Sequence, residues 1–206
     1  MEIIKNHGEI ENKSMEIIRP YVENIFKSEG EIKVASRIIH AAGDVDYAKI
    51  IRIHENAIEA IKNAVLDGKS VYTDVEMVRT GINKKKLAKY GGEVFCKIAD
   101  ENVAKKAMEQ GITRSMAAMR EFGEKLSGAV VAVGNAPTAL FEVLRLVEEE
   151  NILPAAVIGI PVGFVGAAES KSSLMKNKKV PYITVEGTKG GSPIAVAAFN
   201  AVLYQL

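Results

Sequence analysis

The chain has 206 residues, of which 48% are hydrophobic and 26% are charged, which is enough for one domain with a full core. Its formal net charge of +1 gives no overall field that would attract nucleic acid or a membrane surface. The single cysteine, Cys96, excludes an intramolecular disulfide. Neither a signal peptide nor an apolar run of the roughly 18 to 20 residues that span a membrane is evident. We therefore expect a cytoplasmic protein.

The first part of the chain has helical periodicity. The stretch SMEIIRPYVENIFK, with Ser14 as a candidate N-cap, predicts a helix or a pair of helices interrupted at Pro20. We expect residues 1–30 to form a peripheral helical segment of the domain. A second short helix, within KVASRIIHA, ends at Gly43 and carries His40 near its C-terminal end.

From Ala48 onward, strands and helices alternate. The short apolar runs that we expect as strands are AKIIRI, SVYT, EVFCKI, GAVVAVG, PAAVIGI and VPYITVEG, and the longer amphipathic runs between them predict helices. Runs such as AVVAV and AAVIGI are apolar on both faces, which is typical of a parallel sheet covered on both sides. The sequence therefore predicts an α/β fold in one domain over residues 1–206, a three-layer sandwich with a mainly parallel central sheet flanked by helices.

Three of the loops that leave these strands have an unusual composition, namely GNAPTAL, PVGFVGAAESK and EGTKGGSP. Each combines glycines with the start of a helix, where free backbone amides and the positive end of the helix dipole favour an anion. Ligands of parallel α/β sheets bind outside the carboxyl ends of the strands, so these loops predict a binding rim. The alternative for any one loop is a tight turn only. Thr73 and Asp74 end a strand in the same kind of position, where Asp74 is expected to cap the next helix.

Several familiar sequence motifs are absent. No strand is followed by G-x-G-x-x-G, and neither G-x-x-x-x-G-K-[ST] nor G-x-S-x-G occurs, so the usual dinucleotide, triphosphate and serine hydrolase fingerprints are missing. The histidines, His7, His40 and His54, lack the spacing of a zinc site, and no protein-bound metal is expected. From the residues alone, His40 is better explained as a satisfied helix-end histidine, although an imidazole titrates at about pH 6.5 and can transfer protons at neutral pH.

Six stretches of the chain, in sequence order, resemble the precorrin-8X methylmutases of cobalamin biosynthesis, a family that includes the cobalt-precorrin-8 methylmutases. They are RIIHAAGD, TDVEMVRTGI, GITRSMAAMR, GNAPTAL, PAAVIGIPVGFVGAAESK and VPYITVEGTKGGSPIAVAAFNAVL. The resemblance runs from about Ser14 to the end of the chain, and GNAPTAL and PVGFVGAAESK are long, specific strings. One departure is Ala42, where many members of the family have threonine or another small residue.

The resemblance implies an isomerase that moves a methyl group from ring carbon 11 to ring carbon 12 of precorrin-8X, giving hydrogenobyrinate, or of cobalt-precorrin-8, giving cobyrinate. It also implies His40 as the general acid, no cofactor beyond cobalt carried within the substrate, and a homodimer. Because this substrate bears many carboxylates, cations, hydroxyls and backbone amides are candidate contacts. The candidates are Arg37, Thr73, Arg114, Ser115, Asn135, Thr138, Lys171, Lys189 and Gly190.

These candidates also have structural alternatives. Arg114 could serve only to begin a helix, Lys171 could pair with Glu169 on a solvated face, and Asn135 and Thr138 could close their own turn. Two other functions also compete, an α/β enzyme that binds a small phosphorylated substrate at the helix starts and a non-catalytic corrinoid carrier. The first lacks a motif that would activate phosphoryl chemistry, and the second has no need of a general acid.

Overall fold

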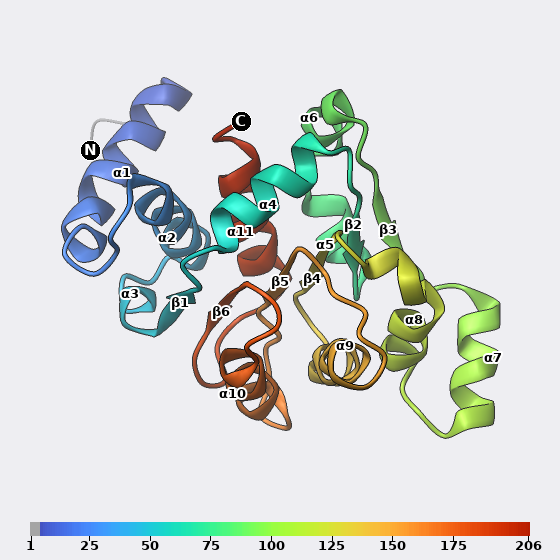
Figure 1. Cartoon of the computed structure of the whole chain (residues 1–206). Coiled ribbons are helices and arrows are strands. Elements are labelled where there is room, and N and C mark those ends of the chain that lie inside the picture. The colour runs from blue at the N-terminus through green and yellow to red at the C-terminus, as the bar shows by residue number, and fades with distance from the viewer. Residues whose placement is uncertain (1–4) are drawn as a thin grey trace.

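A computed structural model describes residues 5–206 and has a six-stranded sheet between two layers of helices (Figure 1). The strand order is β1-β6-β5-β4-β2-β3, and every neighbouring pair is parallel except β1 with β6. The predicted α/β sandwich with a mainly parallel sheet is confirmed. Across residues 5–206, no helix has both the length and the apolar character that crossing a lipid bilayer requires.

The strands are short, with three or four residues each, and most connections between them contain helices. The strands are β1 (Ile51–Ile53), β2 (Val71–Thr73), β3 (Val94–Cys96), β4 (Val130–Val133), β5 (Ala156–Gly159) and β6 (Tyr182–Val185). The helices are α1 (His7–Val22), α2 (Glu29–Ala42), α3 (Tyr47–Ile50), α4 (Ala57–Leu66), α5 (Glu76–Gly81), α6 (Lys84–Leu87), α7 (Glu101–Gln110), α8 (Arg114–Phe122), α9 (Pro137–Glu149), α10 (Ala167–Lys176) and α11 (Ser192–Leu203).

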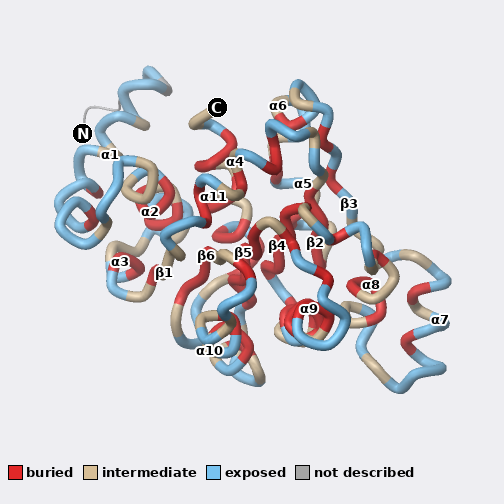
Figure 2. The backbone as a smooth tube through the Cα atoms, viewed as in Figure 1, coloured by how far each residue is buried: buried red, intermediate tan, exposed pale blue. Residues whose placement is uncertain are grey.

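Alternate residues of the central strands enter two separate cores, one on each face of the sheet. Val130 and Ala132 of β4 join the core formed with α2, α4, α5 and α11. Val131 and Val133 join the core formed with α8, α9 and α10. β2, β4 and β5 are buried at every position (Figure 2), which explains why their sequences are apolar without alternation.

The N-terminal segment differs from the predicted interrupted helix. α1 is one continuous helix that begins after Asn6 as its N-cap and runs through Pro20, which lies in its last turn. Proline removes the amide that would donate to the carbonyl of Glu16, and the helix continues for only two residues beyond it. Ser14 lies inside the helix and donates a hydrogen bond to the carbonyl of Ile10 (2.8 Å), so the prediction that it is an N-cap is wrong. α1 packs against α2 at the outside of the molecule (Figure 1).

α2 follows the predicted helix closely at its C-terminal end. A capping box formed by Ser28 and Glu31 begins it, and Gly43, with a left-handed φ of 63°, ends it. His40 lies in its last turn. The next segment, AKIIRI, was expected as a strand, but its first half is α3 and only its second half is β1, because Tyr47 enters the core from a helical turn.

Candidate functional site

The three glycine-containing loops predicted to form a rim lie at one edge of the sheet. β4, β5 and β6 are neighbours and run parallel, so the loops that follow them leave from the same side. Backbone hydrogen bonds join two of these loops, because the amide of Gly191 donates to the carbonyl of Ile160 (2.9 Å) and that of Gly163 donates to Thr188 (3.1 Å). We call residues 134–136, 160–166 and 186–191 the rim loops.

His40 is exposed in the last turn of α2. Asp44, one turn further along the chain, pairs through its carboxylate with the ammonium group of Lys189 in rim loop 186–191. That hydrogen bond holds the pKa of Asp44 below its ordinary value. The same ammonium group lies 5.2 Å from the ring centre of Tyr47. The chain just beyond α2 is therefore joined to the rim, four residues after the exposed His40.

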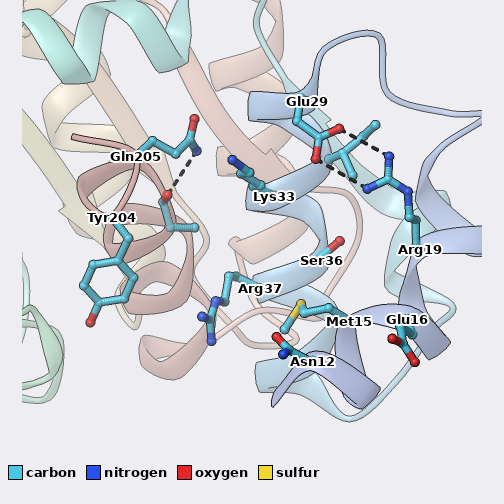
Figure 3. Close-up of a pocket in the computed structure, with 12 residues that line it drawn as sticks. Asn12, Met15, Glu16, Arg19, Glu29, Lys33, Ser36, Arg37, Tyr204 and Gln205 are labelled. Atoms are coloured by element: carbon cyan, nitrogen blue, oxygen red, sulfur yellow. Dashed lines mark hydrogen bonds and ion pairs between the residues drawn. The ribbon is translucent and has the colours of Figure 1, made fainter. Parts of the chain in front are cut away.

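Arg37 faces a separate space, a cavity of about 520 Å³ bounded by α1, α2 and the end of α11 (Figure 3). Its guanidinium group pairs with Glu11 of α1. Lys33 and Ser36 line the same cavity from α2. Because residues three and four apart share one face of a helix, Ser36, Arg37 and His40 lie along one face of α2.

Asp74 is fully buried and binds the rim loop that follows β4. Its two carboxylate oxygens accept hydrogen bonds from the amides of Gly134, Asn135 and Ala136, at 3.0, 2.8 and 2.7 Å. Burial raises the pKa of Asp74, and these amide donors offset part of that effect. The prediction that Asp74 caps the next helix is wrong, because α5 has Val75 as its N-cap and no side-chain cap. β2 and β4 are parallel neighbours, so their carboxyl ends meet instead.

Four of the predicted contacts come together where α8 and α9 begin. Thr113 is the N-cap of α8, and its hydroxyl donates to the hydroxyl of Thr138 in the first turn of α9 (2.9 Å). Arg114 and Ser115, which follow Thr113, therefore lie near Thr138. Asn135, two residues before α9, has an exposed side chain. These residues form a polar patch beside rim loop 134–136.

Two other predicted contacts, Lys171 and Thr73, are fully buried. The ammonium group of Lys171 donates to the carbonyl oxygen of Lys189 (2.5 Å), and burial lowers the pKa of Lys171 to about 8. The alternative that Lys171 pairs with Glu169 on a solvated face is therefore wrong. The hydroxyl of Thr73 donates to the carbonyl of Phe95 (3.1 Å), so it is engaged within the protein.

The predicted cations differ in how free they are to bind a ligand. Arg37 and Lys189 pair with carboxylates, and Lys171 faces a carbonyl oxygen. Arg114 is exposed and forms no ion pair with any residue in the described part of the chain. It also lies in the first turn of α8, where a positive charge opposes the helix dipole. Of the four predicted cations, Arg114 is thus the most available to an anionic ligand.

Sequence reasoning missed the parts played by Asp44 and Asp74. Asp44 belongs to the quoted stretch RIIHAAGD, but its partner Lys189 is 145 residues away in the chain. The loop amides that Asp74 binds are 60 to 62 residues away. A single sequence has no local pattern for such pairs, and only the predicted order of parallel strands could have indicated the second.

Metal-binding and thiol chemistry find little support in the side chains present. Within residues 5–206, no group of three or more His, Cys, Asp and Glu residues is arranged to hold a metal ion. Cys96 is half-buried, and burial raises the pKa of its thiol to about 11. The thiol therefore stays protonated at neutral pH, which is unfavourable for a nucleophile or a metal ligand.

Comparison with known proteins gives matches over nearly the whole chain. A family model described as precorrin-8X methylmutase (CbiC) matches residues 9–205. The chain is 41% identical to the cobalt-precorrin-8 methylmutase of Priestia megaterium, over 94% of this chain and 86% of that protein. It is 39% identical to the precorrin-8X methylmutase of Sinorhizobium sp., over 98% of this chain and 96% of that protein. A solved structure of precorrin-8X methylmutase from Thermus thermophilus is similar with a TM-score of 0.85 and 35% identity, covering 95% of this chain and 96% of that one.

Replacing Asp74 by asparagine tests its hold on rim loop 134–136. Asn has one carbonyl oxygen and an NH₂ donor, so at least one of the three loop amides loses its acceptor. For Asp74→Asn we expect the free energy of unfolding to fall by about 1 to 3 kcal/mol, with faster deuterium exchange at amides 134–136. Asp67→Asn, at the exposed end of α4, is the matched control. Unchanged exchange at these three amides would contradict the assignment.

Proposed function

The chain belongs to the precorrin-8X methylmutase family, and from this we infer that it moves a methyl group from carbon 11 to carbon 12 of a corrin precursor with His40 as the general acid. Its family members are isomerases of cobalamin biosynthesis. Relatives named for precorrin-8X and relatives named for cobalt-precorrin-8 have nearly the same sequence identity to this chain, 39% and 41%. Both substrates undergo the same methyl shift. The proposal therefore covers precorrin-8X and cobalt-precorrin-8.

The position of His40 is the observation that supports its role. Its imidazole is exposed in the last turn of α2, and Asp44 and Lys189 join that end of the helix to the rim. An imidazolium at this place can donate a proton or a hydrogen bond to a ring nitrogen of a bound macrocycle. The conjugated ring becomes more electron-poor, which favours migration of the methyl group.

The reaction is an internal rearrangement and needs no second reactant. The bond from the methyl group to carbon 11 breaks as its bond to carbon 12 forms, the ring double bonds shift, and the proton supplied by His40 returns to the imidazole. The protein contributes by holding the ring in a reactive geometry and by stabilising the charge that moves. We propose that no cofactor takes part, and that any cobalt arrives within the substrate.

Substrate carboxylates would contact the polar patch beside the rim. Arg114 is the unpaired cation there, and Ser115, Asn135 and Thr138 can donate hydrogen bonds to further carboxylate oxygens. Lys189 and the amide of Gly190 offer a second contact region at rim loop 186–191. For the apolar parts of the ring, rim loop 160–166 presents Phe164 and Val165, which are 93% and 89% exposed.

We also propose that the protein is a cytoplasmic homodimer. Apolar side chains of the N-terminal helical segment stay exposed in the single chain, including Ile17 at 59% and Tyr21 at 48%, and Ile25 just beyond α1 is 50% exposed. Such a patch favours burial against a second copy. The cytoplasm agrees with a chain that has a single cysteine and acts in a biosynthetic pathway. Cell fractionation followed by immunoblotting tests the location.

For His40→Ala we expect kcat to fall roughly 10²- to 10⁴-fold, because the general acid is lost. The free energy of unfolding should change by less than about 0.5 kcal/mol, because the side chain is exposed. The assay follows the absorbance of the corrin product from precorrin-8X and from its cobalt form, in buffer containing EDTA and without a methyl donor or nucleotide.

His54→Ala is the matched histidine control for this assay. His54 follows β1 and lies at the opposite edge of the sheet, where its amide donates to the carbonyl of Tyr182 at the start of β6 (2.9 Å). The activity of His54→Ala should equal that of the wild type. Binding of the ring without conversion by the wild-type protein would indicate a carrier, and full activity of His40→Ala would exclude the acid role.

Arg114→Gln should raise KM about tenfold, which corresponds to loss of one charge-assisted hydrogen bond, and should change kcat by less than about threefold. Steady-state kinetics with the same substrates measure both constants. Lys125→Gln is the control, because Lys125 is an exposed cation that precedes β4 at the opposite edge of the sheet. Equal KM values for the two variants would argue against a carboxylate contact at Arg114.

Sedimentation velocity tests the dimer. The expected result is one species of twice the chain mass of 22.3 kDa, which Ile17→Asp shifts toward the monomer because it places a charge within the apolar patch. Lys13→Asp, on an exposed part of the same helix, serves as the control for a new charge. A single 22.3 kDa species for the wild type at micromolar concentration would refute the dimer.

A further inference from the structure

Lys171 is a buried lysine whose charge is directed at the protein backbone. Its side chain is 0% exposed, and its ammonium group donates to the carbonyl oxygen of Lys189 at 2.5 Å. Across residues 5–206, no Asp or Glu lies close enough to form an ion pair with it. The contact joins α10 to rim loop 186–191, because Lys189 is 18 positions further along the chain.

Stability of the fold does not explain a lysine at this place. Burial lowers its pKa to about 8 and is the single cause of the shift, so the surroundings disfavour the charged form and no neighbouring charge compensates. A buried ammonium group loses its hydration, and one carbonyl oxygen satisfies only one of its three donors. A methionine of similar length would fill the same space without that cost.

The loop that Lys171 holds is confined on two further sides. Gly190 has a φ of 150°, and a Cβ atom there would lie 2.6 Å from the carbonyl oxygen of Ile160, so the loop is pressed against the end of β5. On the outer side, the Lys189 side chain pairs with Asp44, just beyond α2. The carbonyl and the side chain of Lys189 thus connect Lys171 inside the protein with the helix end that carries His40.

We propose that Lys171 is a positioning residue for the methyl shift, because its ammonium group anchors the Lys189 carbonyl and so holds rim loop 186–191 against the end of α2 that carries His40. Lys171 acts through Lys189 and Asp44 and does not itself touch the substrate. This inference rests on the proposed function and replaces the direct substrate contact expected from the sequence.

Lys171→Met removes the ammonium group and keeps a long apolar side chain. We expect kcat to fall roughly 10- to 100-fold, because displacement of a catalytic group by about 1 Å has effects of that order, while KM changes less than about threefold. Deuterium exchange at the amides of Gly190 and Gly191 should become faster. Lys176→Met, an exposed lysine on the same helix, should leave kcat, KM and both amides unchanged.

The pH dependence of stability separates positioning from a loss of folding. Below about pH 8 Lys171 is protonated in the folded and the unfolded chain, and the folded chain carries the unfavourable buried charge. Between about pH 8 and 10.5 only the unfolded chain holds the proton, so the wild type gains stability relative to Lys171→Met as the pH rises. Urea unfolding should therefore show the variant at least as stable as the wild type at pH 7, with a difference that shrinks toward pH 10.5.

The kinetics and the amide exchange of Lys171→Met decide the proposal. A kcat of Lys171→Met within twofold of the wild type, or unchanged exchange at Gly190 and Gly191, overturns it. If Lys171→Met is unstable, Lys171→Gln, which keeps an N–H donor, takes its place and should retain more activity than Lys171→Ala. If the wild type converts neither substrate, the proposed function and the catalytic part of this inference fail, while amide exchange still tests the anchoring of the loop.

Discussion

Parallel pairing of β6, β5, β4 and β2 fixes the position of the rim and of the groups beneath it. These strands are buried almost throughout, so their carboxyl ends meet at one edge and their loops have little freedom to separate. Gly159 at the end of β5 sets how closely α10 packs, since a Cβ atom there would lie 2.6 Å from Leu174 and 3.0 Å from Leu140. That close packing places Lys171, one turn before Leu174, under rim loop 186–191.

Two buried charges hold two of the rim loops, and they act in complementary ways. Asp74 accepts hydrogen bonds from three amides of rim loop 134–136, and Lys171 donates to a carbonyl of rim loop 186–191. Charged partners make the stronger backbone hydrogen bonds, particularly away from water. The loops are therefore fixed by side chains from other elements, and exposed residues of the loops, such as Asn135, remain available for a ligand.

The sequence predicted those features that depend on local patterns. Apolar runs indicated β4 and β5, and glycines near helix starts indicated the rim. Local patterns failed at α1, where Pro20 lies in the last turn and does not break the helix, and at Asp74, whose partners lie in the loop after β4. For His40, the residues alone favoured a helix-end histidine, which agrees with its place in α2; only the family resemblance indicated catalysis.

The two outermost strands of the sheet have a consequence for the behaviour of the protein in concentrated solution. β1 and β3 are each three residues long, and Arg52 of β1 pairs with Glu186 of the adjoining loop at 2.9 Å. Long, flat edge strands offer free backbone groups to a further chain and so promote aggregation, whereas short, charged edges do not. Edge-to-edge growth of the sheet into insoluble fibres is therefore disfavoured.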